Sequence, residues 1–360
     1  MNEVRRATLK DIAVSLGVSV NTVSRALTGK DSVGEETRAR IRAEADRLGY
    51  VPNTLARSLV RGSAMTLGLV ITNPSNPFYA KLISVIEQRG KVHGYSFMLL
   101  VTEENAEDDR TAAETLLQWG VDGALVVPVQ GDPASREHAA WGRLHNSGLP
   151  LVLLNRDLPE LGLDFVGVDY REGARQATSH LLAAGARKVC LLEEDLPITA
   201  VRDRIDGFQA ALAEHGLAES VGSIVSVPTR RHEASALPWD PADSYRVAQE
   251  IFAAPETPDA VLVGNDYFAL GVYRAAQETG LRVPEDVLVG GFGDHPFAAY
   301  LNPPLTTVGL PASDIGSAAI DLLLQRMKGQ HDYDSAQNTG DPRKLRLLPE
   351  LRTRESTARN

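Results

Sequence analysis

At 360 residues the chain exceeds one ordinary core, which indicates a small domain joined to one or two larger ones. Its 43% apolar and 23% charged residues exclude disordered, fibrous and disulfide-scaffold classes, and a single cysteine excludes an intrachain disulfide and a cysteine-based zinc site. The net charge of -10, taken over the whole chain, argues against a nucleic-acid partner.

The net charge conceals a basic head and an acidic remainder. Residues 1–62 hold eleven Lys and Arg against seven Asp and Glu, so the acidic excess lies entirely after residue 62. This division is typical of a DNA-binding module joined to a sensor, because phosphate contacts need local positive charge. Charge alone leaves a solvated basic surface equally open.

The first fifty residues predict three helices, over Leu9–Leu16, Val20–Leu27 and Glu35–Leu48. In the first helix the apolar residues are spaced 3, 1 and 3 positions apart, which makes one buried stripe. Gly17 ends this helix, and Ser19 stands where the second helix needs its N-cap.

The spacing of small residues in these helices predicts a helix-turn-helix. Two closely crossing helices need a small residue within the first, a glycine in the turn and a β-branched residue within the second, and Ala13, Gly17 and Val23 occupy those places. The expected core is completed by Ile12, Leu16, Val18 and Leu27. Residues 1–50 are therefore expected to bind DNA, and a three-helix protein-binding module is the alternative.

The exposed N-terminal part of the second helix is expected to reach the major groove. Asn21 and Arg25 are assigned to hydrogen bonds with base edges, and Val20 to apolar base contact. Four hydroxyl residues are assigned mainly to phosphates: Thr8, Ser19, Thr22 and Ser24.

Residues 66–360 alternate short apolar runs with amphipathic segments, after a hinge and linker over 51–65. The pattern predicts parallel sheets covered on both faces, in two doubly wound halves divided near residue 160 with late crossovers. The second half is expected to span about 161–290 and the C-terminal strand, LRLLPELR. The expected strands cover 67–71, 97–101, 123–127, 150–154, 165–168, 188–192, 223–227, 260–264 and 287–292. The expected helices lie near 78–93, 107–119, 134–147, 171–184, 201–215, 242–253, 266–279 and 313–328.

Polar residues follow several of these strands. The carboxyl ends of the strands, at the cleft between the two halves, are where such folds bind ligands. The residues that could bind a hydroxylated ligand there are Asn73, Asn155, Arg156, Asn265 and Asp294. Asn73 and Asn265 could instead cap the helices that follow them.

Signals for catalysis, metals or cofactors are missing from the sequence. The glycine-rich GGFG at 290–293 lacks dinucleotide-binding spacing, and the eight histidines lack metal-ligand spacing. An export signal and a membrane-spanning apolar run are also missing, so a cytoplasmic protein is expected. An extracytoplasmic sugar-binding protein remains the alternative class, and the headpiece argues against it.

The segment TLKDIAVSLGVSVNTVSRALTGKDSVGEETRARI, followed by LGYVPNTLARSL and the C-terminal LPELRTREST, resembles the LacI/GalR family of bacterial transcription regulators over nearly its full length. The resemblance implies a hinge helix over Asn53–Val60, about two turns long and too short to be stable alone. In the family this helix folds when two protomers meet on DNA, and its leucine enters the minor groove. The matching residue is Leu59, accompanied by Asn53, Ala56 and Arg57.

The resemblance also implies a homodimer on a pseudo-palindromic operator and a small, carbohydrate-like effector. A tetramer is not indicated, because the tail has no heptad repeat. In the family the arginine matched by Arg204 contacts the effector. By the same matching Phe78 and Trp239 offer apolar or stacking faces, and Asn155 or Arg156 and Asn265 offer hydrogen bonds. Many relatives have an acidic residue directly after the strand at 287–292, where this chain has Gly293 followed by Asp294. The resemblance therefore implies that a sugar-hydroxyl acceptor is either lost or displaced by one position. The alternatives are ion pairs of Arg204 with Asp203 or Asp206, and a surface position for Trp239.

Overall fold

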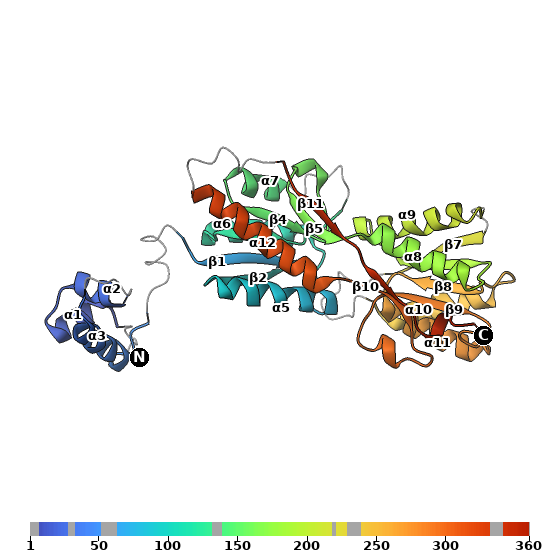
Figure 1. Ribbon diagram of the computed structural model, residues 1–360, viewed down its shortest axis with the longest axis horizontal. Coiled ribbons are helices and arrows are strands. Elements are labelled where there is room, and N and C mark those ends of the chain that lie inside the picture. Colours follow the sequence, from blue (N-terminus) through green and yellow to red (C-terminus); the bar gives the residue numbers. More distant parts are fainter. Residues whose placement is uncertain are drawn as a thin grey trace. The chain divides into compact units, whose positions relative to one another are not determined.

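The structure, a computed structural model, describes residues 7–27, 33–51, 63–131, 139–217, 221–228, 239–331 and 341–359. Its contacts divide the chain into two compact units, Met1–Ala64 and Met65–Asn360. The described part of the first unit is helical, and the second is α/β (Figure 1). None of the described helices combines the length and apolar character that a membrane span requires.

The first unit contains α1 (Leu9–Leu16), α2 (Val20–Leu27) and α3 (Glu35–Arg47), so the three expected helices are confirmed. Their apolar faces meet in one small core, because each amphipathic helix is too short to be stable alone. The buried residues of this core are Ile12, Ala13, Val23, Ala26, Val33, Ile41 and Ala45.

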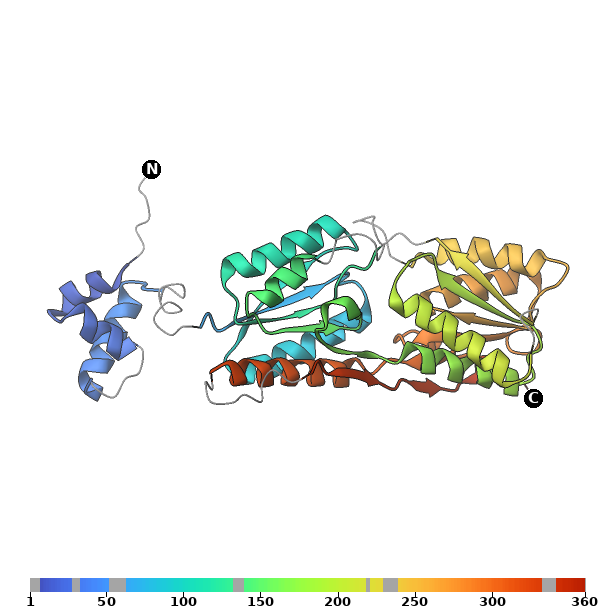
Figure 2. The same cartoon turned by 90° about the horizontal axis from the view of Figure 1, so that it is seen from above.

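The first sheet of the body has six strands in the order β11-β5-β4-β3-β1-β2, and all of its neighbouring strands are parallel. Its strands are β1 (Thr66–Ile71), β2 (Ser96–Val101), β3 (Gly123–Val126), β4 (Leu151–Leu154), β5 (Asp164–Val168) and β11 (Lys344–Leu347). Helices α5 (Pro77–Val92) and α12 (Ala312–His331) pack together on one face (Figure 2). Helices α6 (Ala106–Trp119) and α7 (Ala139–Asn146) cover the other face.

The second sheet also has six strands, in the order β12-β10-β9-β8-β6-β7. Its strands are β6 (Val189–Glu194), β7 (Gly222–Val227), β8 (Ala260–Val263), β9 (Leu288–Gly293), β10 (Thr306–Gly309) and β12 (Glu350–Arg352). One face carries α8 (Tyr170–Ala183) and α9 (Thr199–Glu214), and the other carries α10 (Pro241–Ala253) and α11 (Asp266–Thr279). Short 3₁₀ turns lie at Pro159–Leu161, Ala298–Tyr300 and Glu355–Thr357.

The two sheets repeat one strand order, β2-β1-β3-β4-β5 in the first and β7-β6-β8-β9-β10 in the second. In each sheet the order reverses beside the first strand, which opens a crevice at the carboxyl ends of the strands. The expectation of two doubly wound halves is confirmed.

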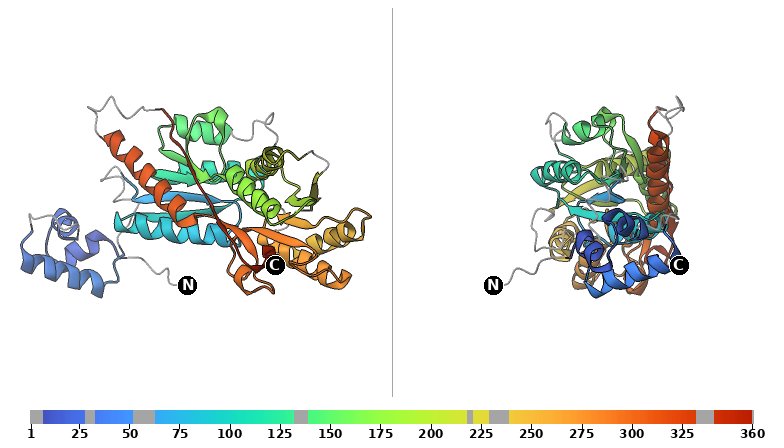
Figure 3. Two further views of the ribbon diagram at one scale, coloured as in Figure 1. Left: turned by 45° about the vertical axis from the view of Figure 1, so that its right-hand side comes forward. Right: turned by 90° about the vertical axis from the view of Figure 1, so that its left-hand side faces the viewer.

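The expected division near residue 160 is wrong, because β5 belongs to the first sheet. The sequence of a buried apolar strand does not indicate which of two sheets it joins, so β5 could not be assigned from its sequence. The expected final strand, LRLLPELR, is also two strands: β11 pairs in parallel with β5, and β12 pairs antiparallel with β10. This segment passes from the first half to the second (Figure 3).

Candidate functional site

The turn between α1 and α2 has the geometry of a helix-turn-helix. Thr8 caps α1 in a capping box, in which the backbone N–H of Thr8 donates to Asp11 Oδ2 at 2.8 Å. Gly17 ends α1 with a φ of 66°, a left-handed conformation that costs glycine little. The Oγ of Ser19 accepts from the backbone N–H of Thr22 at 3.0 Å. The roles expected for Gly17 and Ser19 as helix stop and N-cap are therefore confirmed.

Helix α2 buries one face and exposes the other. Val23 and Ala26 lie in the core of the headpiece. Asn21 and Arg25 are exposed, and Val20 leaves 45% of its surface accessible. The three residues assigned to bases therefore lie on the solvent side of the helix.

The four hydroxyl residues assigned to phosphates are mostly engaged in capping. Thr8 Oγ1 donates to Asp11 Oδ2 at 2.7 Å, and the hydroxyls of Ser19 and Thr22 lie 2.8 Å apart. Thr8 and Ser19 are exposed, whereas Thr22 and Ser24 are half-buried. The expected hinge residues Asn53, Ala56, Arg57 and Leu59 lie outside the described residues.

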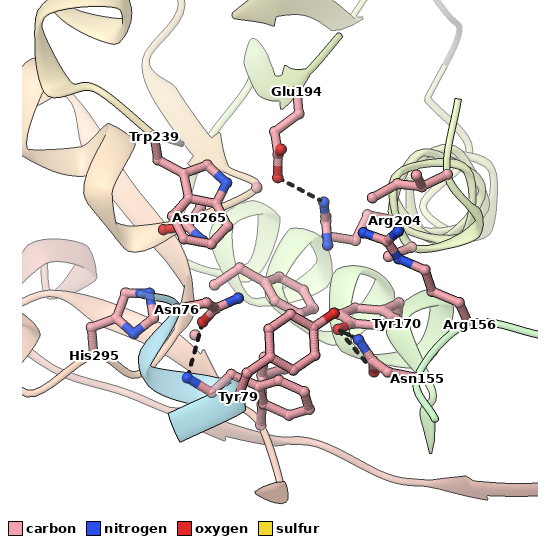
Figure 4. A pocket seen from close by; sticks show the side chains of 17 residues that line it. Asn76, Tyr79, Asn155, Arg156, Tyr170, Glu194, Arg204, Trp239, Asn265 and His295 are labelled. Atoms are coloured by element: carbon pink, nitrogen blue, oxygen red, sulfur yellow. Dashed lines mark hydrogen bonds and ion pairs between the residues drawn. The ribbon is translucent and has the colours of Figure 1, made fainter. Parts of the chain in front are cut away.

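A pocket lies where the carboxyl ends of strands from both sheets face each other (Figure 4). Six of the eight residues expected to bind an effector line it: Phe78, Asn155, Arg156, Arg204, Trp239 and Asn265. Its other lining residues are Asn76, Tyr79, Tyr170, Glu194, Ile198, Ala200, Gly264, Phe292, Gly293, His295 and Leu310.

Arg204, on α9, is buried and held by glutamate. Its Nε and Nη2 each donate to a carboxylate oxygen of Glu193 at 2.7 Å, and its Nη2 lies 4.0 Å from Glu194 Oε1. Its guanidinium carbon lies 5.3 Å from the ring centre of Tyr170 and 5.4 Å from that of Phe292. Burial works against the charge of Arg204, but the carboxylates outweigh it and raise its pKa. Among the described residues, Arg204 forms ion pairs with these glutamates and not with Asp203 or Asp206.

Arg156 follows β4 and forms a second buried ion pair. Its Nη1 and Nη2 donate to the carboxylate of Glu104 at 2.7 and 2.6 Å, and Nη1 also donates to the carbonyl of Pro128 at 3.1 Å. Both side chains are at most 3% exposed. A bidentate carboxylate compensates the cost of burying the guanidinium.

Aromatic and amide side chains complete the lining. Asn155 Nδ2 donates to the hydroxyl of Tyr170 at 2.9 Å, and burial raises the pKa of this tyrosine to about 12. Trp239 is buried and stacks on Tyr267, with 6.0 Å between the ring centres, so its expected alternative as a surface aromatic is wrong. Asn265 caps α11 through its Oδ1 and also lines the pocket, so its two expected roles coexist.

Two expected ligand residues do not line the pocket. Asn73 Oδ1 accepts from the backbone N–H of Ser75 in a turn, while Asn76 caps α5 and lines the pocket instead. Asp294 adopts a φ of 48°, and its carboxylate pairs with Arg352 at 3.0 Å and with Arg354 at 2.7 Å. Its expected contact with an effector therefore competes with two ion pairs.

The sequence interpretation missed Glu104, Glu193, Glu194, Tyr170 and His295. Two adjacent glutamates at the end of the apolar run VCLLEE were an available signal, because strand ends meet at the pocket edge. Among the described residues, no group of three or more His, Cys, Asp or Glu side chains could hold a metal ion.

One amide joins the two halves beside the pocket. Gln130, which follows β3, accepts at Oε1 from the backbone N–H of Thr199 at 2.8 Å and from its hydroxyl at 3.0 Å. Its Nε2 donates to the carbonyl of Asp157 at 2.9 Å. Helix α9 begins after Ile198, whose side chain cannot cap it, so Gln130 supplies the cap from the other half.

Two families match different parts of the chain. Residues 8–53 match the bacterial regulatory proteins of the lacI family, and residues 178–357 match the periplasmic binding protein-like domain. The ribose operon repressor of Escherichia coli K12 is 31% identical over 350 residues, which cover 97% of this chain and 99% of the repressor. The transcriptional repressor PurR of Photobacterium profundum is 30% identical over 97% of this chain and 98% of its own length.

Solved structures show the same likeness. The Lac repressor dimer bound to operator and the anti-inducer ONPF has a TM-score of 0.82 and 25% identity, covering 98% of this chain and 99% of that one. The transcriptional regulator CelR in complex with cellobiose has a TM-score of 0.67 and 28% identity, covering 98% of this chain and all of that one.

Proposed function

Because the chain belongs to the LacI family of bacterial regulatory proteins, we propose that it is a transcriptional repressor that binds operator DNA and is controlled by a small molecule. The observation that carries this proposal is that one repressor matches both the headpiece and the body, over 97% of this chain. The repressors to which it is similar are DNA-binding proteins, and we assign the chain no catalytic role. We place its action in the cytoplasm, where the operator is.

The exposed face of α2 is proposed to read the operator in the major groove. Asn21 and Arg25 would bind base edges, and Val20 would contact a base through its methyl groups. The proposed phosphate contacts come from Thr8, Ser19, Thr22 and Ser24, whose hydroxyls would donate to phosphate oxygens. The proposed hinge contacts are Asn53, Ala56, Arg57 and Leu59.

A homodimer is the assembly proposed to bind DNA, since the Lac repressor of similar structure binds its operator as a dimer. Two copies related by a twofold axis place two recognition helices about one helical turn of DNA apart, which requires a pseudo-palindromic site. The proposed effector is an uncharged, hydroxylated molecule of the carbohydrate type. Buried aromatic faces and amides suit such a ligand, and CelR, which has the same fold, binds cellobiose.

Selection of binding sites from random double-stranded DNA tests the repressor function. We expect full-length protein to enrich one pseudo-palindrome and to bind it at least about 10³-fold more tightly than random DNA. Arg25→Ala should weaken specific binding, while Lys328→Ala, on α12 in the body, should leave it unchanged. Failure to enrich any sequence, together with retained sugar binding, would favour a sugar-binding protein without a regulatory role.

The hinge proposal has its own test. Leu59→Ala should reduce the affinity for the selected site more than that for random DNA, because an inserted leucine acts at one base step of the operator. Fluorescence anisotropy with both DNAs measures this ratio. An unchanged ratio would remove Leu59 from the proposed interface.

A further inference from the structure

His295 lies in the loop after β9 and is held in one orientation. It is 4% exposed, and its backbone N–H donates to Asp266 Oδ2 at 2.8 Å. Its ring centre lies 5.1 Å from that of Tyr267 and 5.8 Å from that of Phe297. The backbone bond therefore anchors the loop, and the two aromatic rings pack against the imidazole.

His295 lines the pocket, and its Nε2 atom is buried and has no hydrogen-bond partner among the described residues. Gly293, with a φ of 132°, lies beside it, and a Cβ at this glycine would stand 3.2 Å from Nε2. Any side chain at position 293 would therefore crowd the imidazole. Burying a polar nitrogen without a partner is costly, so a site of this kind suits a ligand that supplies the missing bond.

Two amides lie on the same side of the pocket as His295 in the view of Figure 4. The Oδ1 atoms of Asn76 and Asn265 are occupied in capping α5 and α11, at 2.9 Å from Phe78 N and 3.0 Å from Tyr267 N. Their Nδ2 groups are therefore the donors that they can turn to a ligand. A hydroxyl suits this corner, because it can donate to an imidazole nitrogen and accept from an amide at once.

We propose that His295 is a specificity-determining residue of the pocket, where its neutral imidazole binds a hydroxyl of an uncharged, polyhydroxylated effector. This inference rests on the proposed function, because it names a residue that would select the effector. Burial lowers the pKa of His295 to about 4, which agrees with an uncharged ring at neutral pH. A phosphate or carboxylate would gain no counter-charge from this imidazole.

The test uses the full-length protein and a panel of probes. D-ribose, D-galactose, cellobiose and adenosine represent uncharged hydroxylated compounds, and ribose 5-phosphate and adenosine monophosphate represent charged ones. Calorimetry gives each affinity for the wild type and for His295→Leu, His295→Gln and the matched control His215→Leu. His215 is an exposed histidine at the end of α9, away from the pocket lining.

We expect at least one uncharged probe to bind the wild type and His295→Leu to bind it at least about tenfold more weakly. His295→Gln should recover part of that loss, because its amide can still hydrogen-bond a hydroxyl, and His215→Leu should match the wild type. Monodeoxy analogues of the bound probe complete a double-mutant cycle. Loss of the recognised hydroxyl should weaken binding to the wild type but change binding to His295→Leu little.

Several results would overturn the proposal. These are binding of the charged probes alone, binding of none of the probes, equal affinity in His295→Leu, or additive effects throughout the cycle. If His295 had only a structural role, His295→Leu would have a lower melting temperature than the wild type, and the effects of the substitution and of the missing hydroxyl would add. DNA selection on the same proteins separates the two proposals, since His295→Leu should still bind the operator if only the effector assignment fails.

Discussion

The two halves of the pocket each bury an arginine, and the two arginines are held differently. In the first half, Nη1 and Nη2 of Arg156 both donate to Glu104, and Nη1 is shared with the carbonyl of Pro128. In the second half, Nε and Nη2 of Arg204 donate to Glu193, while Nη1 has no hydrogen bond among the described residues. Both charges are compensated, but the second half keeps the more accessible donor group for a ligand.

The difference extends to what lies around each guanidinium. Arg204 lies over the rings of Tyr170 and Phe292, which stack on each other with centres 5.9 Å apart. Arg204 belongs to a helix whose cap comes from the opposite half, whereas Arg156 lies in a loop of its own half. We infer that Arg156 maintains the shape of the pocket and that Arg204 binds the ligand.

Removal of either glutamate should have the largest effect, because it strands a buried cation. We expect Glu104→Ala and Glu193→Ala each to lower the free energy of unfolding by about 3–5 kcal/mol in urea denaturation. Glu214→Ala, which breaks an exposed 3.0 Å pair with Arg175, should cost at most about 1 kcal/mol. If one of the two variants lost only a little free energy of unfolding, the ion pair in that half would not be buried as it is in this structure.

Replacing both members of each buried ion pair tests whether its arginine shapes the pocket or binds the ligand. The double variant Arg204→Met/Glu193→Met removes the guanidinium together with the carboxylate that binds it in a bidentate pair, so it should fold while its affinity for the best-binding probe falls about 10- to 100-fold. Arg156→Met/Glu104→Met should fold equally well and lose about threefold in affinity. Both doubles should still bind the selected DNA. Equal losses in the two doubles, measured by calorimetry, would contradict the assigned difference.

The pH dependence of stability tests the second half alone, because His295 and Asp266 both belong to it. Burial lowers the pKa of His295 from 6.5 to about 4 and raises that of the adjacent Asp266 from 3.8 to about 6. Between these values the unfolded chain protonates the histidine first, so His295 makes the fold less stable as the pH falls from 6.5 to 4. Asp266 acts in the opposite direction, because the folded protein takes up its proton first. Asp294, paired with Arg354, also faces this histidine.

His295→Leu should therefore remove the destabilising contribution of His295 at acid pH and leave the stabilising contribution of Asp266. Relative to the wild type, the variant should gain about 2 kcal/mol of unfolding free energy between pH 7.5 and pH 5. Denaturation curves at both pH values measure the gain. If the difference in unfolding free energy between His295→Leu and the wild type were the same at both pH values, the pKa of His295 would not be lowered in the folded protein.

The smallest expected effect concerns the contact between the halves. Gln130→Ala removes the cap on Thr199, and a lost helix cap costs about 1 kcal/mol, or about fivefold in affinity for a ligand that needs both halves. Gln88→Ala, which removes an amide from the exposed face of α5, is the matched control. Unchanged probe affinity in Gln130→Ala would show that this contact is not required for binding.

The headpiece could be predicted from sequence because each of its signals is local. Ala13, Gly17 and Ser19 fall within seven residues, and each marks its own backbone position. Most strands and helices of the body were also recognisable from periodicity, but β10 was not among the expected strands. Their assignment to two sheets was not recognisable, since β5 is fully buried, as are β4 of the first sheet and β8 of the second.

Arg156 and Arg204 were predicted as pocket residues, but the glutamates that bind them were not, and the partner of Arg156 is remote in sequence. Arg156 and Glu104 lie 52 residues apart, and a glutamate after a strand normally indicates a solvated loop. Asp294 was assigned to the effector, but its partner Arg354 lies 60 residues further along the chain. Such ion pairs depend on the sheet order and on left-handed turns, and local sequence specifies neither.

Residues 344–352 have a consequence for the order in which the protein forms. This segment adds β11 beside β5 and β12 beside β10, and it follows every other described strand in the chain. A chain growing from its N-terminus therefore leaves one edge of each sheet open until these residues leave the ribosome. The two sheets receive their last strands within residues 344–352, so both halves are completed at nearly the same stage of translation.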